Sequence, residues 1–210
     1  MEFAKLSEFL QNLEETPSRN KMIEILAELF KVSDRDEIDK ICYLSLGQLA
    51  PLYEGIEFNL AEKMMIRALA QSFNLSESKI KKHSKKLGDL GDVVTELKPK
   101  TRALKLSVLQ VYKRLYEIAM EGGKGSVRRK ISKMATLLGE LDSLSAKYAV
   151  RIPLGKLRLG FSELTIMDAL SWMTAGDKSK RKEIEEAYNV RADIGQIVRL
   201  VKEKGLKGLA

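Results

Sequence analysis

The chain has 210 residues, 44% of them hydrophobic, so it is long enough to bury a core in one large domain or two small ones. Its single cysteine, Cys42, excludes a disulfide framework, and no apolar run approaches the ~20 residues that cross a bilayer. We therefore expect a soluble, cytoplasmic protein that does not contact a membrane. We also expect it to be a monomer.

The formal charge of +8 is distributed unevenly along the chain. Residues 1–97 carry 13 Lys/Arg against 17 Asp/Glu, a net −4, whereas residues 98–210 carry 24 against 12, a net +12. An excess of cations in one half favours a polyanionic partner, most often nucleic acid. The same excess also fits a basic protein whose charge serves only its solubility, so charge alone leaves both interpretations open.

Apolar residues recur at helical spacing along most of the chain. Ser18 and Ser33 are predicted to cap the second and third helices, and Asn59 to begin the fourth. No stretch shows the period-two alternation that indicates a β-strand. We therefore predict an all-α fold of ten or more helices, at residues 3–15, 18–32, 33–49, 59–73, 76–86, 88–97, 107–121, 127–139, 142–152, 161–174, 178–188 and 190–204.

The sequence also contains a diverged internal repeat. It predicts two similar helical lobes, residues 1–97 and 107–210, joined by a basic linker at 98–106 and related by a pseudo-two-fold axis. Their helix-entry loops would then lie on one face, although chance similarity between amphipathic helices remains the alternative. The matching segments are 58–69 with 159–170, "LGQL" at 46–49 with "LGKL" at 154–157, and 19–22 with 128–131.

The loop "EGGKGSVRRK" at residues 121–130 combines glycines, cations and a possible helix cap. Glycines let a backbone approach a ligand closely, and the free amides of a helix N-terminus favour an anion. The spacing does not fit a nucleotide-binding GxxxxGK[ST] loop, so a DNA phosphate is the better candidate anion, with a plain flexible linker as the alternative. The candidate contact residues here are Gly122, Lys124, Gly125, Ser126, Arg128 and Arg129.

A second basic segment, "RIPLGKLRLG" at residues 151–160, leads into a helix. Its alternation predicts that Leu157 and Leu159 anchor the segment in the core while the cations face a minor groove or a phosphate backbone. Such contacts position a protein without reading bases. The candidate contact residues are Arg151, Gly155, Lys156, Arg158 and Gly160, with Asn59 and Lys63 in the counterpart segment of the first half.

Four stretches in this order resemble the N-terminal DNA-binding domain of ATP-dependent DNA ligases of the archaeal and eukaryotic replicative type. They are "SLGQLAPLYEGIEFNLAEKMMIRALA", "KKLGDLGDVV", "AMEGGKGSVRRK" and "VRIPLGKLRLGFSELTIMDAL". The resemblance implies an all-α domain that holds the minor-groove side of nicked double-stranded DNA, while separate adenylation and OB-fold domains seal the nick. Phe161, Ser162 and Asn59 depart from the residues usual in that family.

The resemblance further implies ATP and Mg²⁺ as cofactors of a longer ligase, whose nucleophile is the lysine of a K-x-D-G motif. No K-x-D-G occurs in these 210 residues, so we expect this segment to have no catalytic residue and no cofactor of its own. One histidine and one cysteine also exclude a structural zinc site. A sliding clamp that binds residues 102–104 is a further partner to consider. The alternative function is an all-α adaptor whose basic half docks an acidic protein.

Overall fold

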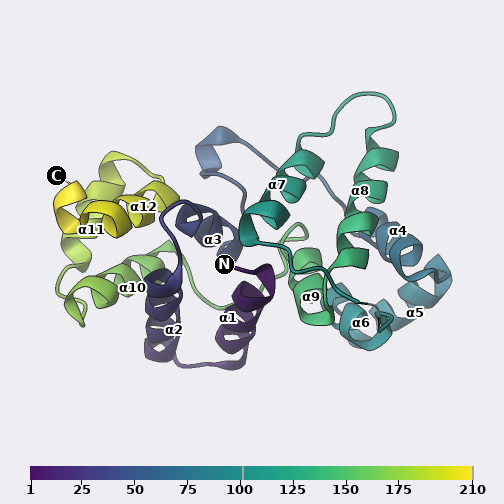
Figure 1. Ribbon diagram of the computed structural model, residues 1–210, viewed down its shortest axis with the longest axis horizontal. Coiled ribbons are helices and arrows are strands. Elements are labelled where there is room, and N and C mark those ends of the chain that lie inside the picture. Colours follow the sequence, from purple (N-terminus) through teal and green to yellow (C-terminus); the bar gives the residue numbers. More distant parts are fainter. Residues whose placement is uncertain (101, 210) are drawn as a thin grey trace.

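A computed structural model describes residues 1–100 and 102–209, and in this part of the chain it is all-α, as predicted. Twelve α-helices are joined by short segments, and two short 3₁₀ turns are added, η1 (Leu52–Glu54) and η2 (Leu206–Leu209) (Figure 1). The helices are α1 (Phe3–Glu15), α2 (Arg19–Val32), α3 (Ile38–Ser45), α4 (Glu62–Phe73), α5 (Glu77–Leu87), α6 (Leu90–Leu97), α7 (Val108–Ala119), α8 (Ser126–Glu140), α9 (Ser143–Arg151), α10 (Glu163–Ala175), α11 (Arg181–Val190) and α12 (Ile194–Lys204).

Two of the three helix starts predicted at a named residue are wrong, and the backbone explains both. Helices α11 and α12 also begin later than predicted, at Arg181 and Ile194 instead of residues 178 and 190. Ser18 does cap α2, by accepting a hydrogen bond from the amide of Lys21. Ser33, however, ends α2, because its hydroxyl donates to the carbonyl of Leu29 at 2.6 Å. Asn59 has a positive φ of 47°, whereas an N-cap residue is extended, so α4 begins three residues later.

The apolar stripes of the helices meet in one continuous core that draws on both halves of the sequence. Helix α2 packs on α10, α4 on α8, α6 on α9, and α3 on α12. In Figure 1, α10–α12 lie with α2 at one end of an elongated molecule, and α4–α6 lie with α8 at the other. Residues 1–97 and 107–210 therefore interlock instead of forming two separately packed lobes, and their division as repeats stays a prediction.

The helix contacts nevertheless recur in a regular way along the chain. The contacts repeat when each helix is replaced by the one six places further on, counting on from α12 to α1. The α2–α10 contact then becomes α8–α4, and the α3–α12 contact becomes α9–α6. The contact of α1 with α9 likewise corresponds to that of α7 with α3. A duplicated unit folded about a two-fold axis would produce this correspondence.

The corresponding helices α6 and α12 also begin alike. The carboxylate of Asp89 accepts a hydrogen bond from the backbone amide of Asp92 at 3.0 Å, and that of Asp193 accepts one from the amide of Gln196, also at 3.0 Å. In each case a glycine two residues after the cap, Gly91 or Gly195, permits close packing. A Cβ added at Gly195 would lie 2.3 Å from Cζ of Tyr43, whose hydroxyl donates to Asp193.

We expect Gly195→Ala to lower the melting temperature by several degrees. The methyl group overlaps the Tyr43 ring, and overpacking of this kind costs about 1–3 kcal/mol. Gly139→Ala in α8 is the matched control, because its added Cβ would meet only the Ser72 hydroxyl, at 3.4 Å. Thermal unfolding followed by circular dichroism measures both variants, and equal melting temperatures would contradict the packing at Gly195.

Candidate nucleic-acid interface

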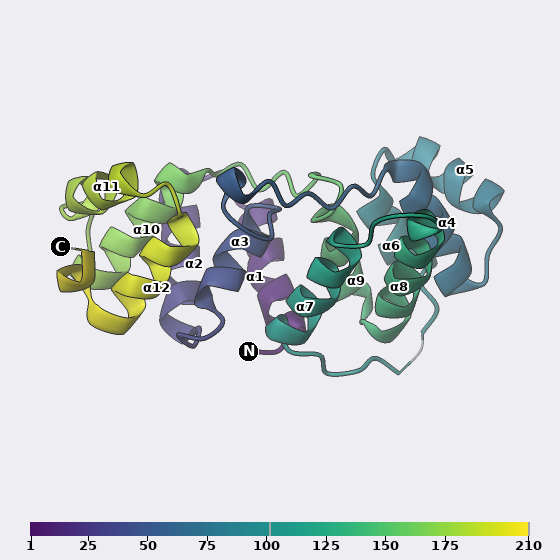
Figure 2. The same ribbon diagram turned by 90° about the horizontal axis from the view of Figure 1, so that it is seen from above.

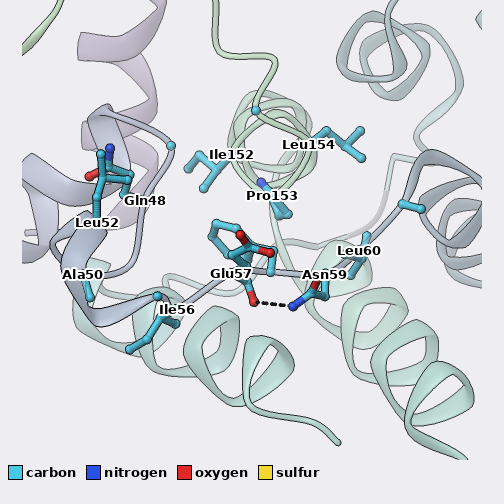
Figure 3. A pocket seen from close by; sticks show the side chains of 15 residues that line it. Gln48, Ala50, Leu52, Ile56, Glu57, Asn59, Leu60, Ile152, Pro153 and Leu154 are labelled. Carbon is cyan, nitrogen blue, oxygen red and sulfur yellow. Dashed lines mark hydrogen bonds between the residues drawn. The ribbon is translucent and has the colours of Figure 1, made fainter.

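Two segments far apart in the sequence, residues 46–61 and 151–162, run side by side along one edge of the molecule (Figure 2). A shallow pocket of about 660 Å³ lies between them. Ile152, Pro153 and Leu154 lie on one side of it, and the chain from Gln48 to Asn59 forms the other (Figure 3). The segments that the repeat predicted to be counterparts are therefore neighbours in space.

In the second segment, the two leucines are buried and Arg158 is exposed, as predicted, whereas Lys156 is half-buried. Leu157 and Leu159 are buried, with 7% and 5% of their surface exposed. Arg158 between them is exposed and has a left-handed backbone with a φ of 52°. The leucines thus anchor the segment in the core while the guanidinium of Arg158 faces solvent.

Helices α4 and α8 pack together, and α8 contacts the first segment. The buried ammonium of Lys130 in α8 donates to the carbonyl of Phe58 at 2.9 Å, and burial lowers the pKa of this lysine. Arg67 of α4 lines a hollow together with Gly125 and Arg128 at the start of α8. Neither helix start has a side-chain cap, so their first amides are open to an anion.

The loop before α8 is held in shape by one of its own cations. Arg129 donates to the carbonyls of Gly122 and Lys124 at 2.8 and 3.0 Å, and it pairs with Glu121. Gly125, with a φ of 80°, takes the N-cap position that the sequence suggested for Ser126, which is instead the first helical residue. Arg129 therefore shapes the loop, and the side chain of Lys124 is exposed.

The predicted contact residues differ in how their charge is used. Within the predicted contact set, four exposed cations form no ion pair with any described carboxylate: Lys63, Lys124, Arg128 and Arg158. Lys156 lies 2.9 Å from Glu62 at the start of α4, which joins the second segment to that helix. The glycines at 122, 125, 155 and 160 and Asn59 are all exposed. This set forms the basic face, defined as residues 59–63, 122–128 and 155–160.

Arg151 was predicted as a DNA contact, but the structure buries it, with 5% of its surface exposed. Its guanidinium donates to Asp89 at 2.9 Å, to Glu14 at 2.8 Å and to Asp92 at 2.9 Å. These hydrogen bonds tie α9 to α6 and α1. The arginine is therefore committed to the fold and is left out of the basic face.

The carboxylate of Glu14 is shared by three donors in this network. Besides Arg151, the hydroxyl of Tyr148 donates to it at 2.7 Å and Lys147 lies 3.0 Å away. Partial burial alone would raise the pKa of Glu14, but the hydrogen bonds from Arg151, Tyr148 and Lys147 outweigh it and lower the pKa to about 2.

Arg19 extends the basic face and was missed as a candidate. It is the exposed first residue of α2, and its guanidinium lies 3.5 Å from the hydroxyl of Thr165 in the first turn of α10. Gly160 lies against Met22 in the same place. The alignment of residues 19–22 with 128–131 was the signal, since it sets Arg19 opposite Arg128.

The chain has none of the marks of a metal centre or a membrane span in its described residues. No group of three or more His, Cys, Asp or Glu side chains is placed to hold a metal ion. None of the described helices is both long and apolar enough to cross a bilayer. The candidate site is thus a surface of loops, helix starts and cations.

The fold and the candidate residues define the chain as an all-α domain with exposed glycine loops, uncapped helix starts and unpaired surface cations. The sequence matches the family described as DNA ligase N terminus over residues 2–171. The chain therefore belongs to the DNA ligase N-terminal family.

Proteins named as DNA ligases are similar to the chain over its whole length. A probable DNA ligase of Dictyoglomus thermophilum is 42% identical over 209 residues, which cover 100% of this chain and 36% of that protein. A DNA ligase of Sulfolobus acidocaldarius is 41% identical, over 99% of this chain and 37% of its own length. A probable DNA ligase of Aquifex aeolicus is 40% identical, again over 36% of its length. The chain thus spans a little over a third of these relatives.

Proposed function

We propose that the chain is the DNA-binding N-terminal domain of a longer ATP-dependent DNA ligase and that its basic face holds nicked duplex DNA. The contacts would go to the sugar–phosphate backbone and the minor groove, without reading the base sequence. The observation that carries the proposal is the position of four unpaired cations, Lys63, Lys124, Arg128 and Arg158, beside glycine turns and uncapped helix starts. Such groups suit phosphates at any sequence.

The paired arrangement of helix starts supports a grip on one duplex. The start of α8 lies beside Arg67 of α4, and the start of α2 lies beside the first turn of α10. Under the proposed repeat of residues 1–97 and 107–210, these two pairs are equivalent. Equivalent sites about a two-fold axis suit the two antiparallel strands of a duplex.

The chemistry of sealing would belong to the rest of the longer protein. ATP, Mg²⁺ and the lysine of a K-x-D-G motif are implied by the family resemblance, and we assign none of them to these residues. The part proposed for this chain is to bind the nicked duplex as a monomer and to keep it in place. A sliding clamp at residues 102–104 stays a weaker proposal, with Leu104 exposed there.

The proposal is tested by titrating the 210-residue chain with nicked duplex at several salt concentrations. We expect the logarithm of the affinity to fall linearly with that of salt concentration, by nearly one unit of slope per neutralised phosphate. Lys156→Ala/Arg158→Ala should weaken binding to every sequence and flatten the slope by about 2.

Lys31→Ala is the control for that titration. Lys31 is an exposed cation in the last turn of α2, at the opposite end of the helix from Arg19. Its replacement by alanine should leave the affinity for nicked duplex unchanged. A protein adaptor would show no retention of DNA at moderate salt. If the double variant and the parent bind nicked duplex with the same affinity at every salt concentration, the second segment is not part of the interface.

A further inference from the structure

Helix α5 carries a dense set of lysines that the basic face does not include. Lys79, Lys81, Lys82, Lys85 and Lys86 are all exposed, and Ile80 is the helix's buried residue. Lys81 pairs with Glu77 at 3.2 Å. The other four lysines form no ion pair with any described carboxylate.

Part of this charge opposes the helix that carries it. Lys85 and Lys86 lie in the last turn, where the helix dipole favours cations, but the pairs Lys81–Lys85 and Lys82–Lys86 bring like charges together four residues apart, which is destabilising. The helix is held by its ends instead, with Ser76 as N-cap and Gly88 as a left-handed C-cap. A repulsive stripe on a well-capped helix indicates that the charge has a use outside the fold.

The corresponding helix at the other end of the molecule, α11, is different. Its cations are matched by acids on the next turn, with Arg181 lying 3.8 Å from Glu185 and Lys182 lying 3.9 Å from Glu186. Helices α5 and α11 pack alike against α4 and α10. The excess of positive charge is therefore present on α5 and not on α11.

Helix α5 continues the basic face. Glu77 in its first turn lies 3.6 Å from Arg67, and Arg67 lines the hollow at the start of α8. In Figure 2, α5 lies at the end of the same edge along which residues 46–61 and 151–162 run. A duplex lying along that edge would pass α5 after leaving the loops.

We infer that the lysine face of α5, formed by Lys79, Lys82, Lys85 and Lys86, binds the phosphate backbone of one arm of the duplex, beyond the nick. The inference rests on the proposed function. Lys79 and Lys86 are separated by about 10 Å along the helix axis, which corresponds to about three base pairs of DNA. The domain would then hold one arm over a longer stretch than the other.

The test uses a variant and three nicked duplexes. Lys82→Gln/Lys85→Gln/Lys86→Gln removes charge from α5, and the duplexes have two long arms, or one arm or the other shortened by a helical turn. We expect the parent to lose about tenfold in affinity when one particular arm is shortened and little when the other is. The variant should bind the long duplex about tenfold more weakly, with a salt slope smaller by about 2–3, and should lose nothing more on shortening.

Lys182→Gln in α11 is the matched control and should behave as the parent. The α5 variant should melt close to the parent, because the removal of like-charge pairs offsets the loss of the cations in the last turn. A variant that binds the long duplex as tightly as the parent, or that is still sensitive to arm length, overturns the inference. A parent that fails to bind any of the three duplexes overturns the proposed function itself, which is a distinguishable result.

Discussion

Replacing Arg151 by methionine is expected to lower the melting temperature of the chain by about 10 °C. The change removes three hydrogen bonds and leaves the carboxylates of Asp89, Glu14 and Asp92 without their shared cation. Asp89 is itself buried. Breaking a buried ion pair from one side costs about 3–5 kcal/mol, and for a chain of this size each kcal/mol corresponds to about 2–4 °C.

Thermal unfolding of two further variants separates the network from general effects. Arg158→Met makes the same substitution at an exposed, unpaired position and should leave the melting temperature unchanged. Arg151→Lys keeps the charge but cannot donate to all three carboxylates at once, so we expect it to lower the melting temperature less than Arg151→Met does. If Arg151→Met and Arg158→Met melt alike, the guanidinium does not hold α1, α6 and α9 together.

The pH dependence of stability provides a second measure of the same network. The pKa of Glu14 is lowered to about 2 in the folded chain from an ordinary 4.5, so the unfolded chain takes up a proton first as pH falls. The stabilisation is therefore complete above about pH 4.5 and is lost as the pH falls toward 2. Arg151→Met should make the loss across this window shallower, because the principal donor to Glu14 is gone.

Local patterns in the sequence account for the helices but not for the burial of Arg151. Apolar spacing placed all twelve helices, and the alternation in residues 155–160 correctly assigned Leu157 and Leu159 to the core. Arg151 stands near Lys156 and Arg158 in sequence, and only the fold brings it to Glu14, which lies 137 residues earlier in the chain. A contact across that separation leaves no trace in the residues around either partner.

The two wrong helix starts have a similar origin. Serine is a favoured N-cap residue, but the hydroxyl of Ser33 can equally donate to a carbonyl of the preceding helix, and it does so to Leu29 of α2. Asn59 adopts the left-handed backbone of the turn before α4, which asparagine tolerates. The spacing of apolar residues does not distinguish this conformation from that of an N-cap. By contrast, the Asp-x-Gly starts at residues 89 and 193 were visible in the sequence, and they are a further repeated feature, at a separation different from that of the other matching segments.

Removing both loops of the basic face should abolish tight binding of nicked DNA. Lys124→Ala/Arg128→Ala disables the loop before α8, and Lys156→Ala/Arg158→Ala disables the second segment. Each double variant should flatten the salt slope by about 2, and the quadruple variant by about 4. Four lost charge-assisted contacts predict a fall in affinity of about 100-fold or more at moderate salt.

The energies should add, because the two loops belong to different segments and share no side-chain partner. Lys124 lies in the loop before α8 and Arg128 in the first turn of α8, whereas Lys156 contacts Glu62 of α4. Additivity in both affinity and slope is the result expected when both loops hold one duplex. If the quadruple variant binds no more weakly than the weaker double variant, the loops do not act on the same DNA, and the continuous face joining α4, α8 and residues 155–160 is not the binding surface.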